Sequence, residues 1–325
     1  MENSHIYRTL GKSGLKISAL GLGCWQFSKG KGLMGGYWPS LEVQDMRDIL
    51  KISMEGGINW FDTAEAYGWG ESERSLSNAL HHLGKENGEI IIATKWWPLF
   101  RFAGNITKTI DKRLKALNGF GIDLYQIHQP FSFSTTKSQM KAMAELVSAR
   151  KIRFIGVSNF SAKRMRLAQE ELSKHGLNLI SNQVRYNLLD RKIETNGILD
   201  TAERLGVSII AYSPLAQGLL TGKFHDHPHL IKSRGIRKYM KQFRSKGLEK
   251  SWPVIEALKD IAGKYSVTPS QVALNWLINF HGDRVLAIPG ATKVRHAEEN
   301  TGALRFRLTD DEMGRLDAVS RAFRD

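Results

Sequence analysis

NWFDTAEAYG, at residues 59–68, changes character halfway along. Its first part, with Ile58 before it, is apolar and favours a β-strand, whereas charged residues and glycines occupy the stretch from residue 62 to residue 73. We therefore expect a strand that ends at Asp62, and we expect Asp62 and Tyr67 to lie where that strand opens onto a loop.

Two later strand-like segments end in the same way. IIIAT at residues 90–94 is followed by Lys95, and DLYQI at residues 123–127 is followed by His128. If these strands are parallel neighbours, their carboxyl ends meet at one edge of a sheet, which is where parallel-sheet enzymes place their chemistry. The pattern predicts a proton-transfer site without a metal, made by Asp62, Tyr67, Lys95 and His128.

Strand-like and helix-like segments alternate along most of the chain. Each short apolar run is followed by an amphipathic run with the period of a helix. The pattern contains eight such units, and eight parallel strands close a barrel that has no free edge. The expected strand and helix pairs are 17–25 and 41–55, 58–62 and 72–83, 90–95 and 106–117, 123–128 and 137–148, 153–159 and 162–173, 179–184 and 197–205, 207–212 and 252–265, and 284–288 and 294–301.

The two ends of the chain add to this barrel. Residues 7–10 and 15–18 flank GKSG and predict a β-hairpin, and residues 310–320 predict an appended helix. The fold class that we expect is α/β, a (β/α)8 TIM barrel with an N-terminal β-hairpin and a C-terminal extra helix, as a single domain over residues 1–325. An open doubly wound sheet is the alternative, but GLGCWQ at residues 21–26 lacks the third glycine of a dinucleotide-binding turn.

Charge and composition limit the functional classes. The formal net charge is +15, and a local block of basic residues lies between residues 232 and 250. Because this block has neither interleaved aromatic residues nor a nucleic-acid motif, it favours a solvated loop or a phosphate contact over a nucleic-acid partner.

We expect no membrane partner and a cytoplasmic location, because the sequence has neither a signal peptide nor a run of about 18 apolar residues. Cys24 is the single cysteine, which excludes an intrachain disulfide, and the sequence leaves the oligomeric state open.

The chemistry of the four residues is that of carbonyl reduction. A tyrosine loses its proton near pH 10, so a tyrosine that acts as an acid near neutrality needs a nearby cation, which Lys95 supplies. Asp62 keeps Lys95 charged, and His128 orients a carbonyl oxygen by hydrogen bonding. The hydride must come from a cofactor, because no side chain carries one.

At these residues the chain resembles the aldo-keto reductase superfamily, whose Asp, Tyr, Lys and His tetrad matches in order, spacing and context. GINWFDTA at 57–64, GVSNF at 156–160 and AYSPL at 211–215 extend the resemblance. It implies a barrel that binds an extended nicotinamide dinucleotide. The long loop after the seventh strand is more similar to the bacterial, plant and potassium-channel β-subunit branches than to the mammalian aldose reductases.

The resemblance also implies a set of cofactor contacts. Ser158, Asn159 and Gln183 would hold the nicotinamide carboxamide, and Tyr212 would stack on the ring. His296 departs from the family, because better-known members have an arginine there. The other implied contacts are Ser213, Leu215 and Gly218 at the pyrophosphate, Lys223 and Arg234 in a covering loop, and Thr292, Arg295, His296, Glu299 and Asn300 at the adenosine end.

The function that we expect is NADPH-dependent reduction of a small aldehyde or ketone to an alcohol, with Tyr67 as the proton donor. A redox-sensing NADP-binding scaffold with slow turnover is the alternative. NADH is the less favoured cofactor, because Lys223, Arg234, Lys293 and Arg295 are available for the 2′-phosphate. Trp25, Trp38, Trp97 and Phe131 are candidates for an aromatic substrate pocket.

Overall fold

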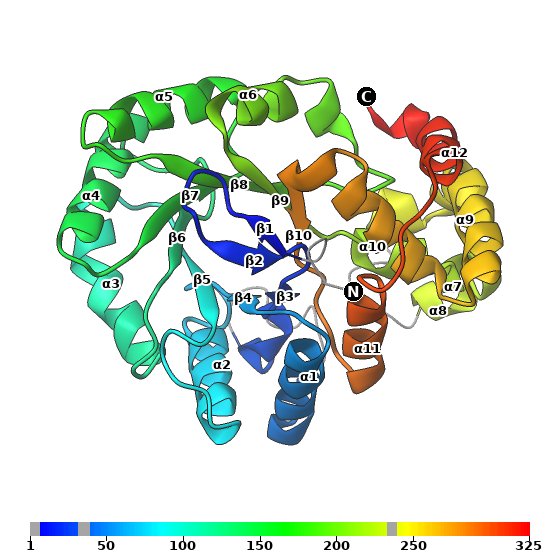
Figure 1. Cartoon of the computed structure of the whole chain (residues 1–325), viewed down its shortest axis with the longest axis horizontal. Helices are drawn as coiled ribbons and strands as arrows, with labels where there is room; N and C mark the ends of the chain where they lie inside the picture. The colour runs from blue at the N-terminus through cyan, green and yellow to red at the C-terminus, as the bar shows by residue number, and fades with distance from the viewer. Residues whose placement is uncertain (1–6, 32–39, 233–238) are drawn as a thin grey trace.

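Eight parallel strands form the centre of the computed structural model, which describes residues 7–31, 40–232 and 239–325 (Figure 1). The strands are hydrogen-bonded in chain order from β3 to β10. Parallel bridges from Leu20 to Ala287 and from Gly23 to Gly290 join the two ends of this sheet, so it closes into the predicted barrel. The strands are β3 Leu22–Gly23, β4 Trp60–Asp62, β5 Ile91–Trp96, β6 Leu124–Ile127, β7 Phe154–Ser158, β8 Leu179–Arg185, β9 Ser208–Tyr212 and β10 Val285–Ala287.

The predicted hairpin covers one end of the barrel. Its strands, β1 Tyr7–Thr9 and β2 Lys16–Ser18, pair antiparallel and cross the barrel in front of the other strands in Figure 1. Ile17 is fully buried in one apolar cluster with Trp60. The Arg8 guanidinium donates a hydrogen bond of 2.6 Å to the carbonyl oxygen of Val285. The hairpin therefore closes the amino-terminal end of the barrel and leaves the carboxyl ends of the strands for the site.

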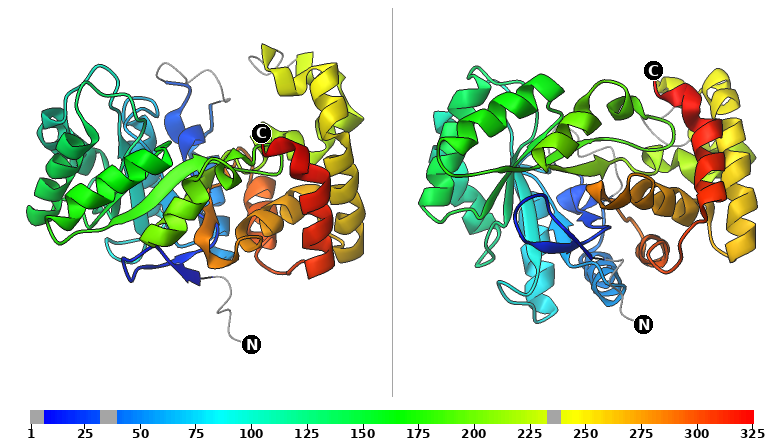
Figure 2. Two further views of the ribbon diagram at one scale, coloured as in Figure 1. Left: turned by 90° about the horizontal axis from the view of Figure 1, so that it is seen from above. Right: turned by 45° about the horizontal axis from the view of Figure 1, so that its top comes forward.

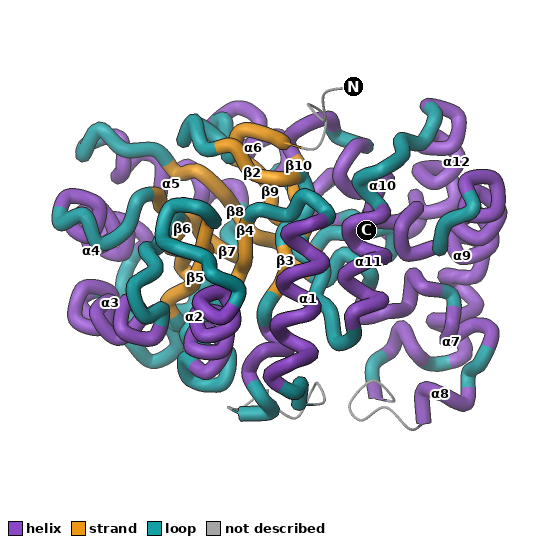
Figure 3. The backbone as a smooth tube through the Cα atoms, turned by 60° about the horizontal axis from the view of Figure 1, so that its bottom comes forward, coloured by secondary structure: helices purple, strands orange, loops and turns teal. Residues whose placement is uncertain are grey.

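A ring of helices surrounds the strands (Figure 3). These helices are amphipathic because apolar residues recur at helical spacing, and that face packs on the barrel. The predicted 162–173 helix is observed with the same bounds. The ring contains α1 Val43–Glu55, α2 Glu71–His82, α3 Gly104–Ala116, α4 Thr136–Ser148, α5 Ala162–Ser173, α6 Ile198–Leu205, α10 Pro269–Asn279 and α11 Val294–Gly302.

One position in the ring differs from the prediction. The helix expected at 252–265 is part of α9, Ser245–Tyr265, which lies outside the ring beside α12, Asp310–Ser320 (Figure 2). The helix that packs on β10 is α10. Its residues are almost all buried, so it lacks the amphipathic period on which the prediction depended. Thr268 and Gln271 form a capping box at its start, where Pro269 is the first helical residue.

The first barrel strand is much shorter than the expected 17–25. Residues 16–18 belong to the hairpin, and only Leu22–Gly23 is a regular strand. A Cβ atom on Gly21 would lie 2.3 Å from the indole of Trp60, so only glycine allows the chain to pass this close. Trp25, which was expected to end this strand, begins a short 3-10 helix beyond it, η1 Trp25–Ser28.

The remaining short elements follow β8 and β9, precede β10 or end the chain. They are η3 Lys192–Glu194, η4 Ala216–Thr221, α7 Lys223–Asp226, α8 His229–Lys232, η6 Lys241–Phe243, η7 Gly282–Arg284 and η8 Arg321–Phe323. Among the described residues, no helix combines the length and hydropathy needed to cross a bilayer.

Candidate active site

Three of the four predicted catalytic residues lie at the carboxyl ends of neighbouring parallel strands. Asp62 is the last residue of β4, Lys95 is the last but one of β5, and His128 directly follows β6. Tyr67 lies in the loop after β4, where its backbone N–H donates to the carbonyl oxygen of Ala64 at 3.0 Å. The structure therefore brings all four side chains to one edge of the barrel.

The ammonium group of Lys95 is the centre of this arrangement. It donates hydrogen bonds to Asp62 Oδ1, to the carbonyl oxygen of Thr63 at 2.9 Å and to the hydroxyl of Tyr67 at 3.5 Å. Lys95 is fully buried, and Asp62 is 1% exposed. A buried ammonium ion is strongly unfavourable unless a charge and hydrogen-bond acceptors compensate it, so the three oxygens keep Lys95 protonated inside the barrel.

The second carboxylate oxygen of Asp62 accepts hydrogen bonds from two glutamines. Gln183 Nε2 lies 2.9 Å and Gln126 Nε2 lies 3.2 Å from Oδ2. Both amides are buried, so they supply neutral donors to a carboxylate that water does not reach. Gln126 was not among the predicted site residues. One sequence feature could have identified it: it is a polar residue inside the otherwise apolar strand LYQI, and it pairs with Lys95 in the strand register.

Aromatic rings surround the hydroxyl of Tyr67 and the imidazole of His128. The ring centres of Tyr67 and His128 are 5.6 Å apart, edge to face. The ring centres of Trp97 and His128 are 5.2 Å apart, also edge to face, and Trp25 stacks on Tyr67 at 6.0 Å. Trp25 and Trp97, two of the predicted pocket residues, therefore lie beside the predicted catalytic groups.

Burial and the neighbouring polar groups together set the pKa values of Tyr67 and Lys95. Desolvation raises the pKa of Tyr67 above 10.0, and the nearby Lys95 ammonium only partly opposes this. Burial alone would lower the pKa of Lys95, but Asp62 and Tyr67 outweigh it, so the pKa lies above 10.5. Both groups therefore carry their protons at neutral pH.

His128 is held in its neutral form. Burial, with a smaller contribution from Lys95, lowers the pKa of His128 well below 6.5. Its Nδ1 is buried and has no hydrogen-bond partner among the described residues. A neutral imidazole can donate one N–H to an oxygen in the site without competing with Lys95 as a cation.

The residues expected around a nicotinamide carboxamide form a connected group. The hydroxyl of Tyr212 donates to Asn159 Oδ1 at 3.1 Å, and Asn159 Nδ2 donates to the hydroxyl of Ser158 at 3.0 Å. Ser158 in turn donates to the carbonyl oxygen of Gln183 at 2.8 Å. Asn159 has a φ of 59°, a left-handed conformation that asparagine tolerates better than most residues. This conformation directs the chain away from β7 at the carboxyl edge.

The expected pyrophosphate segment follows β9. Gly218 and Ser213 have φ values of 91° and 52°, so the chain turns sharply through this segment. The side-chain oxygen of Gln217 is buried and lacks a hydrogen-bond partner among the described residues. Lys223 Nζ lies 5.0 Å from the centre of the Phe224 ring, near Gly218. A groove borders this segment and is lined by Arg185, Asn187, Leu189, Asp190, Ser213, Ala216, Gln217, Leu219 and Gln242.

The expected adenosine contacts lie along α11 and just before it. His296 Nδ1 lies 3.2 Å from both the backbone nitrogen and the hydroxyl of Thr292. Arg295 pairs with Glu299 at 3.2 Å, and the Arg295 side chain is 76% exposed. Asn300 is buried, and its Nδ2 has no hydrogen-bond partner among the described residues. Buried polar atoms without partners, here and at Gln217, fit a segment that a polar ligand completes.

Some predicted residues are placed differently or lie outside the described chain. Phe131, in the loop after β6, is 59% exposed, so more than half of its surface contacts solvent and not a pocket wall. Leu215, the N-cap of η4, is half-buried against the core. Trp38 and Arg234 fall in segments 32–39 and 233–238, outside the described residues.

A closed (β/α)8 barrel with a buried Lys–Asp pair and an adjacent tyrosine defines a class of barrel oxidoreductases. A model of the aldo/keto reductase family matches residues 19–321. The chain belongs to this family.

The relatives include proteins of bacteria and of plants. An uncharacterized oxidoreductase of Mycobacterium bovis is 36% identical over 311 residues, covering 95% of this chain and 91% of the relative. The chloroplastic pyridoxal reductase of Arabidopsis thaliana is 31% identical, covering 94% of this chain and 84% of the relative.

Solved structures share the architecture. The glycerol dehydrogenase of Gluconobacter oxydans has a TM-score of 0.84 at 26% identity, covering 100% of this chain and 98% of that one. An aldo/keto reductase of Klebsiella pneumoniae, solved with NADP and acetate, has a TM-score of 0.72 at 25% identity, covering 97% and 94%. This chain is therefore an oxidoreductase of the aldo/keto reductase family.

Proposed function

We propose that the protein is an NADPH-dependent reductase that converts aldehydes or ketones to alcohols. The observation that carries this proposal is the hydroxyl of Tyr67, 3.5 Å from the buried ammonium of Lys95, which Asp62 keeps charged. The nicotinamide, when bound, supplies the hydride for the carbonyl carbon. Tyr67 gives its proton to the carbonyl oxygen, so the product is a neutral alcohol.

The other residues have distinct roles in this proton transfer. Lys95 stabilises the phenolate that Tyr67 becomes, because the two groups share a hydrogen bond inside the protein, where charges interact strongly. His128 is neutral and edge-on to Tyr67, and it donates a hydrogen bond to the same carbonyl oxygen. Trp25 and Trp97 place apolar ring surface beside this position.

The cofactor proposal rests on residues that fit its parts. Ser158, Asn159 and Gln183 hold the carboxamide, and Tyr212 supports the ring. The Nδ2 donor of Asn300, which has no hydrogen-bond partner among the described residues, is suited to an acceptor of the adenosine segment. The complex of the Klebsiella relative with NADP supports the same class of cofactor. NADPH is preferred to NADH because cationic side chains, Lys293 and Arg295, lie at the start of α11.

The proposed substrates are small carbonyl compounds with a flat or apolar body. Trp25 and Trp97 offer ring surface beside Tyr67 and His128, and burying apolar surface contributes about 25 cal/mol per Å². Aromatic aldehydes should therefore be reduced with a higher kcat/KM than open-chain sugars. Pyridoxal belongs in the same comparison, since the Arabidopsis relative is named as a pyridoxal reductase.

The test is steady-state oxidation of NADPH, followed by absorbance, with aromatic aldehydes, pyridoxal, methylglyoxal, sugars and ketones. Repeated turnover with at least one class of carbonyl is the expected result. Oxidation of a single equivalent of bound NADPH, followed by no further turnover, would contradict the proposal and favour a redox-sensing scaffold.

A further inference from the structure

Glu65 lies between Asp62 and Tyr67 but faces away from the reacting groups. It is 7% exposed, and its backbone N–H donates to the carbonyl oxygen of Lys95 at 3.1 Å. Its carboxylate accepts the backbone N–H of Trp97 at 3.1 Å and Arg101 Nη1 at 2.7 Å. Glu65 thus ties the loop that carries Tyr67 to the loop that begins at Trp97.

Arg101 extends this connection to a third loop. Its carbonyl oxygen accepts the backbone N–H of Phe133 at 3.1 Å and the hydroxyl of Ser132 at 2.9 Å. Two residues further on, the backbone N–H of Ala103 donates to the hydroxyl of Ser134 at 2.8 Å. Residues 132–134 belong to the loop that starts at His128, so one arginine links the loops after β4, β5 and β6.

A second group of charged residues lies next to Glu65. Arg113 in α3 lies 4.0 Å from Glu65 and 3.3 Å from Glu73. Glu73 is fully buried and accepts the hydroxyl of Thr94 at 2.6 Å. Thr94 immediately precedes Lys95 in β5, so this layer also fixes the strand that carries Lys95.

We propose that Glu65 and Arg101 are positioning residues of the active site. Their ion pair fixes the loop after β5 against the loop after β4 and thereby places the backbone carbonyl of Arg101, which holds the loop after β6. In this way the pair sets the rings of Tyr67, Trp97 and His128 against one another. Neither side chain touches the reacting atoms. The kinetic consequence rests on the proposed reductase function, whereas the coupling of the loops does not.

The position of the pair distinguishes it from an ordinary surface ion pair. The side chains of Arg101 and Glu65 are 27% and 10% exposed. The loops that they join carry rings only 5.2 to 5.6 Å apart at the site. A displacement of about 1 Å at such a site lowers the rate by up to about 100-fold. Arg284 and Glu203 provide a matched control, because they form a pair of the same chemistry at 2.7 Å with half-exposed side chains.

The kinetic experiment compares Arg101→Met, Glu65→Gln, the double variant and Arg284→Met. We expect kcat/KM to fall about 10-fold to 100-fold in both single site variants, mainly through kcat, with NADPH affinity unchanged. The double variant should be no worse than the poorer single variant, because the two side chains act as one unit. Arg101→Lys should recover most of the rate, since it keeps the charge beside Glu65.

A second experiment does not depend on turnover. Hydrogen–deuterium exchange should increase together in residues 65–72, 97–103 and 128–135 of Arg101→Met and stay unchanged there in Arg284→Met. If Glu65→Gln fails to fold, Arg101→Met decides the question alone, because it leaves Arg113 beside Glu65. Lower thermal stability with unchanged kcat/KM, or unchanged exchange in 128–135, would overturn the inference. A parent enzyme that turns over no carbonyl contradicts the proposed function instead, and exchange then decides the coupling.

Discussion

Lys95 shows at the residue scale how a charge is kept inside this barrel. An ammonium group has three hydrogens to donate, and Lys95 has three oxygen acceptors, on Asp62, Thr63 and Tyr67. Asp62 is completed in turn by the amides of Gln126 and Gln183. The Lys95–Asp62 pair is therefore fully hydrogen-bonded, and Lys95 links it to the hydroxyl of Tyr67.

The proton donor gives the first prediction. Replacing Tyr67 with Phe removes only the hydroxyl, so carbonyl reduction should fall at least about 100-fold, the scale for loss of a general acid. NADPH affinity, measured by fluorescence, should remain close to that of the parent. Tyr265→Phe is the control, because its hydroxyl bonds to Glu312 away from the site. Near-parental turnover in Tyr67→Phe would remove Tyr67 from its proposed role.

The pH profile of reduction gives the second prediction. The pKa of Tyr67 lies above 10.0 because of burial, and that of His128 lies well below 6.5. At neutral pH both groups are in the form that reduction needs, so kcat should be flat through pH 6.5 and fall only when Tyr67 loses its proton above pH 10. Measuring kcat against pH at saturating NADPH tests this. An inflection near pH 6.5 that disappears in His128→Gln would show that the imidazole titrates in the working range.

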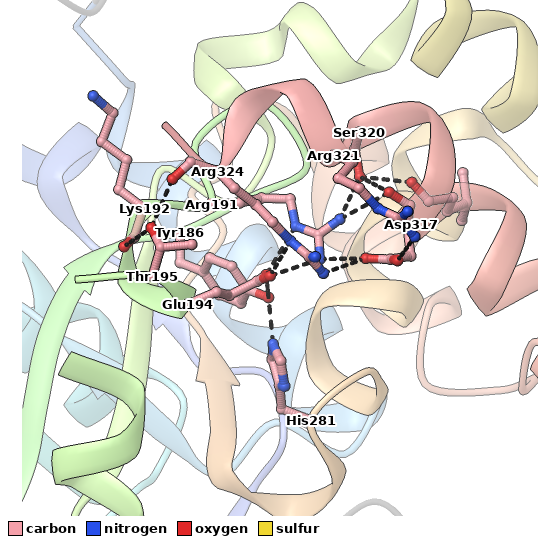
Figure 4. A network of polar contacts seen from close by, with 11 residues as sticks. Tyr186, Arg191, Lys192, Glu194, Thr195, His281, Asp317, Ser320, Arg321 and Arg324 are labelled. Atoms are coloured by element: carbon pink, nitrogen blue, oxygen red, sulfur yellow. Dashed lines mark hydrogen bonds and ion pairs between the residues drawn. The ribbon is translucent and has the colours of Figure 1, made fainter. Parts of the chain in front are cut away.

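At the scale of elements, a buried ion network attaches the C-terminal helix to the barrel (Figure 4). Arg191 is fully buried and pairs with Glu194 at 2.7 Å and with Asp317 of α12 at 2.6 Å. Arg324 contacts the same two carboxylates at 2.8 and 2.6 Å. We name these four residues the C-terminal clamp. Arg191, its first residue, directly follows Asp190, which lines the groove beside Ser213. The clamp therefore also fixes one wall of that groove.

The third prediction concerns the stability of this clamp. Burial alone would raise the pKa of Glu194, but the contact with His281 at 3.5 Å and the hydrogen bonds from Arg191 and Tyr186 outweigh it and lower the pKa from 4.5 to about 2. A carboxylate with a lowered folded-state pKa stabilises the protein above its unfolded pKa, and this stability is lost as the pH falls towards the folded pKa. Glu194→Gln should lower the free energy of unfolding by about 3 kcal/mol at pH 7, the scale for breaking a buried ion pair.

The measurement is urea unfolding of the parent and of Glu194→Gln at several pH values. The difference between them should be full above pH 4.5 and should shrink as the pH falls towards 2. Glu203→Gln, which breaks the half-exposed pair with Arg284, should cost less than about 1 kcal/mol. A difference for Glu194→Gln that is the same at pH 3 and pH 7 would show that its charge does not stabilise the clamp.

At the scale of the whole molecule, the net charge of +15 attracts an anionic cofactor but does not by itself select NADPH. Selection requires cations fixed at the 2′-phosphate. Among the predicted adenosine contacts, Arg295 already pairs with Glu299, and His296 is hydrogen-bonded to Thr292. Glu299 therefore both orients Arg295 and competes with a phosphate for it.

The last prediction tests whether Arg295 recognises the 2′-phosphate. The parent should prefer NADPH to NADH by at least about tenfold in kcat/KM, the value of one good charge-assisted phosphate contact. Arg295→Ala should lower this ratio, and raising the salt concentration should lower it further, because screening acts over about 8 Å at 0.15 M. The ratio of kcat/KM with NADPH to kcat/KM with NADH is measured for the parent and for Arg295→Ala in steady-state assays at fixed aldehyde concentration. A strong preference that survives Arg295→Ala unchanged would assign phosphate recognition to other residues.

The sequence by itself determined the barrel, the hairpin and the bounds of α5 and α12, because alternating strand and helix periods and turn residues are local properties of the chain. It also predicted which residues would reach the carboxyl edge, since parallel strands that end in a titratable residue all end on the same side.

The tertiary structure alone decided which helix covers β10. Because α10 is apolar all round, it has no period to detect, and the amphipathic α9 was expected in its place. It also decided the contacts between distant residues, such as Gln183 with Asp62 and Glu65 with Arg101. Those contacts depend on strand register and on the paths of loops, and neither is encoded in the neighbouring residues of any one segment.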